Sequence, residues 1–464
     1  MKTILDIQSA LIHKKTSILE TVSSYLKKIE KENPKLNAFL TITGESALKL
    51  AAKQDKELAK NPDIFAQKPL FGVPTAYKDL FLTKGIRTTA GSKVLENYLP
   101  QYSATVVEKL EGSGAISLGK LNCDAWAHGA SGENSQFGPT RNPEAPDYVP
   151  GGSSSGTACA VAAGLVPFAI GTDTGGSIRQ PANFCGVVGT KPTYGRVSRY
   201  GVIAMASSLD SMGHITNNVS DAAKVLEITA GHDPYDSTSA GLPVPKYSAN
   251  LEKKLGKIKV GIAKEYLDGL THPDVTSSFE KAKSVLLSMG VELVEISLPH
   301  TKYGIPVYYV IQPAEVSSNL SRYDGIRYGK NRSHFGDEAK RRIIIGTYTL
   351  SAGYYDAYYV KAMKIRTLIK QDFTDCFKTV DAILSPVSPF PAFKIGEKVG
   401  DPLAMYLADV YTATINLAGL PAIALPTGKN SEGLPLGIQL ISGQFTEERL
   451  FPVAYQFEKI LHGQ

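Results

Sequence analysis

Two glycine–serine turns and one upstream lysine are the residues of this sequence whose types and spacing could do chemistry. The turns are Gly-Gly-Ser-Ser-Ser-Gly at 151–156 and Thr-Gly-Gly-Ser at 174–177, and Lys78 lies upstream in an otherwise apolar run. Ser153 follows Lys78 by 75 residues, and Ser177 follows Ser153 by 24 residues. This arrangement favours nucleophilic catalysis by a serine without a histidine.

The three side chains have complementary chemical requirements. A serine hydroxyl attacks only after a base takes its proton, and a lysine can be that base only when it is neutral. Apolar neighbours disfavour the ammonium form and so lower the pKa of a lysine. Glycines let backbone N–H groups crowd a reacting centre, where they stabilise a developing oxyanion. The residue types therefore fit one reaction centre.

Each feature has a plainer interpretation when it is taken alone. Glycine–serine clusters are usually turns, and Lys78 could simply pair with Asp79. The segment 152–156 also fits a Gly-x-Ser-x-Gly nucleophile elbow with Ser154 at its centre. That elbow requires a late histidine, and His462 falls in a fraying tail. The order and spacing of the lysine and the two turns favour the lysine mechanism.

The elements that must position these residues alternate between strands and helices. Helical patterns cover 16–33, with Thr16 or Ser17 as N-cap and Pro34 beyond the end, and about 45–60. Between 70 and 230 the alternation predicts a mainly parallel sheet covered by helices on both faces. The expected strands there are 71–81, 115–119, 166–170 and 187–191, and the expected helices are 103–111, 156–163 and 220–230.

A second series of expected helices and strands follows a Pro-, Ser- and Asp-rich boundary at 232–256. Tyrosine-rich helices are expected over 303–378. The remaining expected elements are a strand at 257–263, a helix at about 273–289, and strands at 291–296, 382–385 and 422–426. These later strands are expected to return to the same sheet.

Composition and charge are those of an ordinary globular protein. The 464 residues are 43% hydrophobic and 20% charged, with a net charge of +6 that forms no basic block. The four cysteines, at 123, 159, 185 and 376, lack metal-site spacing and are expected to be reduced thiols. We therefore expect no metal site. No signal peptide or membrane-spanning run is apparent, so we expect a cytoplasmic protein without membrane contact.

The motifs taken together resemble the amidase signature family. The strings that carry the resemblance are 77–80 (Tyr-Lys-Asp-Leu), 151–156 and 173–181 (Asp-Thr-Gly-Gly-Ser-Ile-Arg-Gln-Pro). The family cleaves carboxamides with a Ser–Ser–Lys triad on an α/β fold, a large mixed, mainly parallel sheet with helices on both faces. Further strings resemble the A subunits of tRNA-dependent amidotransferases (GatCAB); these are 133–143, 191–201, 206–210, 324–329, 340–346 and 416–421.

The resemblance covers about residues 5–460 and implies one amidase-signature domain over 1–464. Within that domain, an N-terminal helical segment spans about 1–65 and a catalytic core spans about 66–230. A C-terminal portion of about 255–464 is expected to complete the sheet and the substrate pocket.

By position, the resemblance assigns the roles in the triad. Ser177 is the expected nucleophile, Ser153 the bridging serine and Lys78 the base, and the peptide bond before Ser153 is expected to be cis. The Ser177 N–H is expected to complete an oxyanion hole with three other backbone N–H groups, those of Thr174, Gly175 and Gly176.

The resemblance also assigns the residues that hold glutamine. Tyr308, Arg342 and Asp409 match the substrate positions, and an arginine fork suits the α-carboxylate as an aspartate suits the α-ammonium. Two features depart from the family pattern. Ser155 stands where glycine is more common, and the connection over 330–339 is shorter than usual.

The same resemblance implies partners, the B and C subunits of a heterotrimer. The chain is expected to hydrolyse glutamine and to send ammonia to the B subunit, while the pair is braced by the C subunit. With ATP and Mg²⁺, the B subunit is expected to convert Glu-tRNA(Gln) to Gln-tRNA(Gln), or Asp-tRNA(Asn) to Asn-tRNA(Asn), and to make most of the contact with misacylated tRNA. This chain is expected to bind no cofactor. The alternatives are a free-standing amidase acting on small carboxamides and a non-catalytic scaffold.

Overall fold

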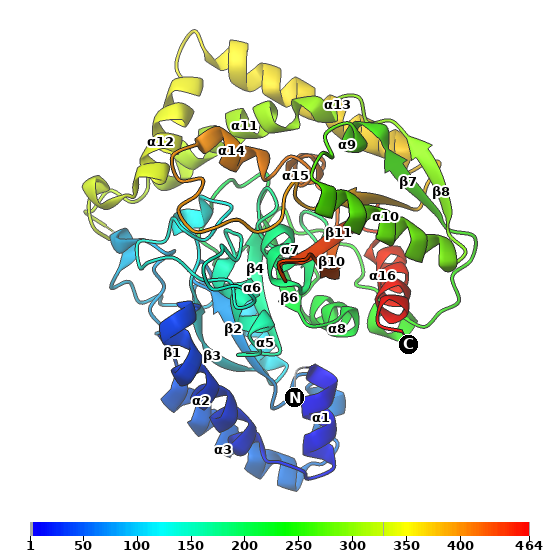
Figure 1. Ribbon diagram of the computed structural model, residues 1–464. Coiled ribbons are helices and arrows are strands. Elements are labelled where there is room, and N and C mark those ends of the chain that lie inside the picture. Colours follow the sequence, from blue (N-terminus) through cyan, green and yellow to red (C-terminus); the bar gives the residue numbers. More distant parts are fainter. Residues whose placement is uncertain (1–2, 328, 464) are drawn as a thin grey trace.

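The computed structural model describes residues 3–327 and 329–463, so Tyr328, within the 324–329 string, lies outside the described part. Eleven strands of the described chain form one sheet, in the order β1-β3-β2-β4-β6-β5-β10-β11-β9-β7-β8 (Figure 1). Their bounds are β1 Phe39–Ile42, β2 Pro74–Lys78, β3 Ile116–Leu121, β4 Phe168–Asp173, β5 Val188–Lys191, β6 Ser211–Thr216, β7 Lys259–Ala263, β8 Glu292–Ile296, β9 Ala382–Pro386, β10 Ala422–Lys429 and β11 Pro435–Ile441.

The helices surround this sheet, with α1 to α3 at one end of the molecule and α11 to α13 at the other (Figure 1). Their bounds are α1 Ile4–Ile12, α2 Ile18–Leu36, α3 Gly44–Lys60, α4 Ile64–Gln67, α5 Thr105–Gly112, α6 Ser155–Ala162, α7 Arg179–Cys185, α8 Val219–Thr229, α9 Lys264–Leu267, α10 Pro273–Ser288, α11 Gly304–Leu320, α12 Asp337–Thr349, α13 Lys361–Cys376, α14 Pro402–Leu407, α15 Ala413–Ala418 and α16 Glu447–Leu461.

Helices cover both faces of the sheet, as the sequence predicts. A side chain at Gly213 of β6 would meet Ile178, directly before α7. The neighbouring residue, His214, instead faces Ala222 of α8. Because successive strand residues point to opposite faces, α7 and α8 lie on opposite sides of β6.

The sheet is mixed, but the expectation of mainly parallel pairing is wrong. Strands β2 and β3, β2 and β4, β7 and β8, and β7 and β9 pair in parallel. Six other pairs are antiparallel: β6 with β4 and with β5, β10 with β5 and with β11, β11 with β9, and β1 with β3 at one edge. A short connection is enough for antiparallel neighbours, whereas parallel strands need a crossover.

The N-terminal helices follow the sequence expectation except at one end. Ser17 is the N-cap of α2 and forms a capping box with Glu20, as its position predicts. Pro34 lies inside α2 instead of beyond it, and the helix continues to Leu36, where Asn37 in the left-handed conformation ends it. The helix expected at about 45–60 is present as α3.

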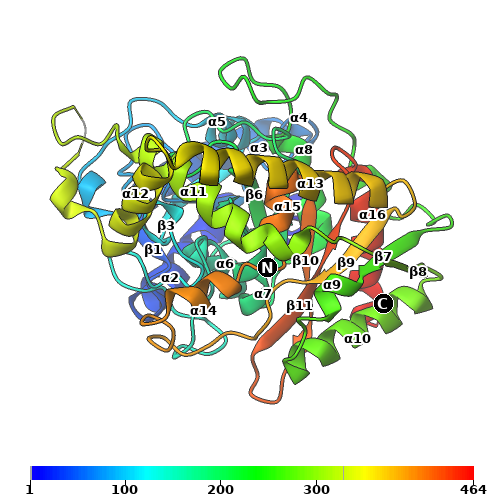
Figure 2. The same ribbon diagram turned by 90° about the horizontal axis from the view of Figure 1, so that it is seen from above.

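Two parallel strands bring the chemically interesting segments together. Strand β2 ends at Lys78 and its neighbour β4 ends at Asp173, so the lysine and the 174–177 turn lie at the same edge of the sheet. The 151–156 turn leads into α6, whose helix packs against β2 and β4. Seen from above, α11 and α13 run side by side, and α15 packs against both of them (Figure 2).

Candidate active site

Lys78 is fully buried and touches three hydroxyl groups. Its Nζ lies 2.8 Å from Ser153 Oγ, 3.0 Å from Ser154 Oγ and 2.8 Å from Thr172 Oγ1. The Ser154 hydroxyl donates its own proton to the Thr172 carbonyl at 3.0 Å. The lone pair of a neutral lysine can therefore accept a proton only from Ser153 or from the Thr172 hydroxyl. This geometry suits proton transfer between Ser153 and Lys78.

The charge state of Lys78 is set by two opposing effects. Burial lowers the pKa of Lys78 from 10.5 to about 8, although the Cys123 thiol and the carboxylates of Asp124, Asp173 and Asp210 act in the opposite direction. Desolvation wins because the whole side chain is buried, which disfavours the ammonium form. A substantial fraction of Lys78 is therefore neutral just below pH 8, as its apolar setting in the sequence predicts.

The 174–177 turn is held from one side by Asp173. The Asp173 carboxylate accepts hydrogen bonds from the backbone N–H of Gly176 at 2.9 Å and of Ile178 at 3.1 Å. It is also paired with the buried guanidinium of Arg179 at 3.0 Å. Burial alone raises the pKa of Asp173, but Arg179 outweighs burial and brings the pKa to about 2. A permanent buried anion thus shapes the turn that carries Ser177.

The backbone N–H of Gly176 already donates to Asp173, so it is not available to the expected oxyanion hole. In the described part of the chain, the backbone N–H groups of Thr174, Gly175 and Ser177 have no such partner. Gly176 has a φ of +139°, and a Cβ there would lie 2.4 Å from Thr412 Oγ1, so only glycine fits. The turn keeps three amides available to a developing oxyanion.

Ser177 lies at the edge of the buried cluster. It is 8% exposed, whereas Ser153 is fully buried. The expected relay needs a hydrogen bond between Lys78 and Ser153 and another between Ser153 and Ser177. The first is present, whereas among the described residues no hydrogen bond joins the hydroxyls of Ser153 and Ser177. The Gly152–Ser153 peptide bond is cis, as the resemblance implies.

Arg342 and Asp409 lie on either side of Tyr309. The Tyr309 hydroxyl donates to Asp409 Oδ2 at 3.2 Å, and the Arg342 guanidinium lies 5.4 Å from the centre of the Tyr309 ring. Gln312 Oε1 and Glu338 Oε1 each accept a hydrogen bond from Arg342 at 2.8 Å. An anchored guanidinium and a carboxylate are thus close together and nearly buried.

Asp409 changes its protonation state near neutral pH. Burial raises its pKa to about 7, against the lowering effects of Arg342 and of the Tyr309 hydrogen bond. A Cβ built on Gly176 would come within 3.4 Å of Asp409 Oδ1, so this carboxylate lies beside the 174–177 turn. A cationic group that enters here would gain a charge-assisted hydrogen bond and keep Asp409 ionised.

The structure places Tyr308 against the 174–177 turn as well. A Cβ on Gly175 would lie 2.6 Å from the Tyr308 hydroxyl, so the phenol packs directly on the turn. The family resemblance pointed to Tyr308 and missed Tyr309, which contacts both charged residues. Because Tyr308 and Tyr309 are adjacent, the sequence does not indicate which of the two rings contacts the charged residues.

A cavity of about 280 Å³ opens next to this cluster. Residues 129–131, 133 and 134 line it together with Tyr309, Arg342 and Tyr406. Its lining includes one of the charged residues expected to hold the α-groups of an amino acid. A pocket of mixed apolar and convergent polar groups is typical of small-molecule sites.

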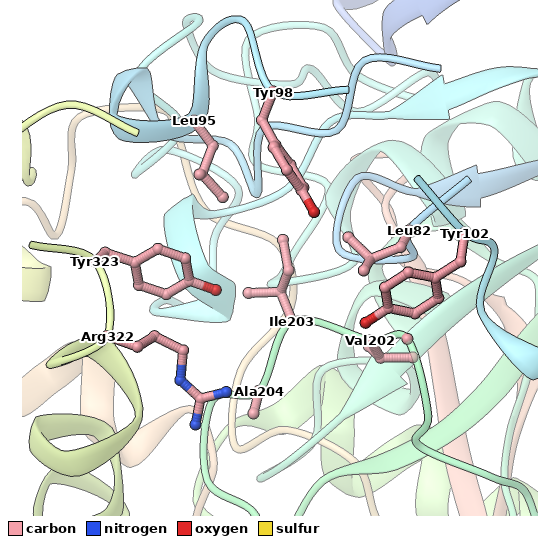
Figure 3. Close-up of a pocket in the computed structure, with 10 residues that line it drawn as sticks. Leu82, Leu95, Tyr98, Tyr102, Val202, Ile203, Ala204, Arg322 and Tyr323 are labelled. Atoms are coloured by element: carbon pink, nitrogen blue, oxygen red, sulfur yellow. The ribbon is translucent and has the colours of Figure 1, made fainter. Parts of the chain in front are cut away.

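A separate cavity of about 370 Å³ lies over residues 201–204 (Figure 3). Tyr98, Tyr102 and Tyr323 extend toward it from three sides, with Ile203 at its floor and Arg322 beside Ala204 (Figure 3). None of the residues assigned to the triad lines it.

The two departures from the family pattern are both accommodated. Ser155 is buried at the start of α6, where its hydroxyl lies 3.2 Å from that of Thr140. In the short connection, residues 332–334 form a single 3₁₀ turn that runs into α12, and the Gln136 amide donates to the His334 carbonyl at 2.9 Å. Neither segment contacts Lys78.

Other residues of the described chain behave as structural ones. Trp126 packs against Tyr323 and Phe335 with ring centres 4.7 and 5.3 Å away. All four cysteines are free, and three are buried. In the described ranges, no three His, Cys, Asp or Glu side chains are grouped to hold a metal ion, and none of the helices has the length and apolarity to cross a membrane.

Comparison with known proteins decides the family. The sequence model of the Amidase family matches residues 20–451. The chain belongs to the amidase family. The glutamyl-tRNA(Gln) amidotransferase A subunit of Geobacter metallireducens is 52% identical to it, with 98% of this chain and 96% of that protein aligned. A protein of the same name from Coxiella burnetii is also 52% identical, over 99% of this chain and 97% of that protein.

Solved structures of the amidase family share the fold. The crystal structure of the glutamyl-tRNA(Gln) amidotransferase A subunit from Thermotoga maritima superposes with a TM-score of 0.82 at 41% identity, covering 98% of this chain and 94% of that one. The peptide amidase of Stenotrophomonas maltophilia superposes with a TM-score of 0.85 at 28% identity, covering 99% and 97%. One amidase fold thus serves both proteins.

Proposed function

We propose that this chain is the glutamine-hydrolysing A subunit of a tRNA-dependent amidotransferase. The observation that carries the proposal is the pairing of Lys78 and Ser153 with Arg342 and Asp409 around the 174–177 turn. The first pair suits amide cleavage, and the second suits the two charged α-groups of an amino acid. The names of the relatives at 52% identity add glutamyl-tRNA(Gln) as the molecule that is amidated and indicate an enzyme of more than one subunit.

In the proposed reaction, neutral Lys78 takes the proton of Ser153 while Ser153 takes the proton of Ser177. The Ser177 oxygen attacks the γ-carbonyl carbon of glutamine, and the amides of Thr174, Gly175 and Ser177 stabilise the oxyanion. The C–N bond then breaks, the relay returns a proton to the leaving nitrogen, and ammonia departs. Water attacks the resulting γ-glutamyl ester in a second round, which releases glutamate and restores Ser177.

Glutamine binding in this scheme uses charges that the chain already holds in place. The α-carboxylate pairs with Arg342, whose guanidinium is fixed by Gln312 and Glu338. The α-ammonium pairs with Asp409. Tyr308 packs on the nucleophile turn, and Tyr309 lies between the two charged residues. An aliphatic amide offers neither charge and gains none of this binding energy.

The proposed assembly is a heterotrimer with B and C subunits. The B subunit is expected to consume ATP and Mg²⁺, to hold the misacylated tRNA and to receive the ammonia, while the pair is braced by the C subunit. This chain is expected to bind no cofactor. The small, dispersed net charge of +6 supports a minor role in RNA contact, because tight RNA binding needs several basic residues on one face.

Co-purification followed by a transamidation assay tests the proposal. The complete heterotrimer should convert misacylated tRNA in the presence of ATP and Mg²⁺ with either glutamine or ammonium. The Ser177→Ala complex should lose the reaction with glutamine and keep the reaction with ammonium. If no complex forms and the isolated chain rapidly hydrolyses simple amides, the chain is a free-standing amidase, as the likeness to a peptide amidase would then indicate.

A further inference from the structure

Asp210 ends the 206–210 string, and in the described chain it makes no hydrogen bond to Lys78, Ser153 or Ser177. It is 5% exposed, and its carboxylate accepts three hydrogen bonds. The Thr174 hydroxyl donates to Oδ1 at 2.7 Å, the backbone N–H of Ala206 donates to Oδ1 at 3.2 Å, and that of Met205 donates to Oδ2 at 2.9 Å. Asp210 therefore joins the 205–210 segment to the first residue of the nucleophile turn.

The 205–210 segment is in turn fixed to two helices, of which α11 carries the substrate residue Tyr308. Glu315 of α11 accepts hydrogen bonds from the backbone N–H of Ser208 at 2.8 Å and from its hydroxyl. Arg366 of α13 donates to the Ser208 hydroxyl and carbonyl at 2.8 and 2.9 Å. Tyr308 lies about two turns before Glu315 on α11, so one helix contacts the pocket and also holds the segment that ends in Asp210.

We propose that Asp210 is a positioning residue for the oxyanion hole, which orients the backbone N–H of Thr174 through the Thr174 hydroxyl. The inference rests on the proposed glutamine hydrolysis. Asp173 holds the turn through Gly176 and Ile178, but it makes no hydrogen bond to Thr174 in the described chain. Asp210 supplies the second support, on the opposite end of the turn. An oxyanion donor acts only when its N–H points at the developing charge before the reaction begins.

The Thr174 side chain offers a matched pair of variants. Thr174→Val has the same shape and lacks the hydroxyl, whereas Thr174→Ser keeps the hydroxyl and lacks the methyl group. The control is Thr229→Val, which removes a buried hydroxyl that donates to the Val225 carbonyl at 3.0 Å inside α8, away from the site. Glutamine hydrolysis is measured as kcat and KM for each purified chain in its complex.

Thr174→Val should lower kcat about tenfold and leave KM for glutamine nearly unchanged, because only transition-state stabilisation is lost. Thr174→Ser should keep most of the wild-type kcat, and Thr229→Val should match the wild type. A kcat for Thr174→Val within twofold of the wild type, or equal losses for the Val and Ser variants, would overturn the proposal. If the wild-type complex itself fails to hydrolyse glutamine, it is the proposed function that fails.

Asp210→Asn provides an independent test. The comparison uses the kcat reached well above pH 8, where Lys78 is neutral with or without the Asp210 charge that raises its pKa. There Asp210→Asn should lower kcat at least as much as Thr174→Val, and combining the two should add little, since both remove the same contact. Losses that multiply in the double variant would contradict a shared contact. Should Asp210→Asn not fold, the Thr174 pair still decides the question.

Discussion

Lys78 allows a quantitative prediction that does not depend on catalysis. Its pKa falls from 10.5 to about 8 on burial, and each pKa unit corresponds to ~1.4 kcal/mol. The folded state therefore bears a penalty of about 3 kcal/mol for a protonated Lys78 at neutral pH. Lys78→Met removes the titrating group and keeps a side chain of similar length.

The sign of the pH dependence follows from the two protonation states. Well below pH 8 both folded and unfolded chains are protonated at Lys78, and the full penalty applies. Between pH 8 and 10.5 the unfolded chain binds the extra proton, so the wild type gains stability as pH rises. Relative to Lys78→Met, the wild type should gain about 2 kcal/mol between pH 7.5 and 9.5.

Urea unfolding of both proteins at several pH values measures this difference, with the single tryptophan, Trp126, as fluorescent probe. Hydroxyls left without a partner in Lys78→Met shift its stability by a constant amount and do not affect the slope. Parallel stability curves for the two proteins over this range would refute the depressed pKa. They would also remove the reason to regard Lys78 as a base.

Lys78→Arg tests whether Lys78 acts as the base, because arginine keeps the charge and does not lose its proton. Glutaminase activity should collapse in this variant. More than about a tenth of the wild-type rate, a barrier change under ~1.4 kcal/mol, would exclude Lys78 as the base. Mass spectrometry of trapped wild-type enzyme should place a γ-glutamyl ester on Ser177, whereas an adduct on Ser154 would support the nucleophile elbow. Arg342→Ala should impair glutamine far more than an uncharged aliphatic amide, and equal losses on both substrates would contradict its role. KM for glutamine should rise as pH falls through about 7, the pKa of Asp409, and Asp409→Asn should abolish that dependence; an unchanged wild-type KM would argue against an ionised Asp409.

The sequence was sufficient to predict the contact between Lys78 and Ser153 only through the resemblance of its motifs to the amidase signature family, which assigns the two residues to one triad. It was not sufficient for the supports of the turn. Asp173 could be seen beside Ser177, but its capture of the Gly176 amide depends on the three-dimensional course of the turn. Tyr309 and Gln312 act on residues 100 and 30 positions away, contacts that local pattern does not reveal.

The pairing of the sheet escaped prediction for a related reason. Strand β6, Ser211–Thr216, contains Gly213 and His214 and has no alternation of apolar and polar residues. It is fully buried between β4 and β5, so its stability comes from its neighbours and not from strand propensity. Without β6, the strands between 70 and 230 read as an uninterrupted parallel series.

The site also explains why several carboxylates do not trap Lys78 as an ammonium ion. Arg179 neutralises Asp173, so the charge closest to the nucleophile turn already has a partner. Asp124 and Asp210 are desolvated enough that burial raises their pKa values to about 6, yet both remain ionised at pH 8. They hold the pKa of Lys78 near 8 and prevent burial from lowering it further. A base whose pKa lies near the working pH combines a large neutral fraction with a strong affinity for the proton.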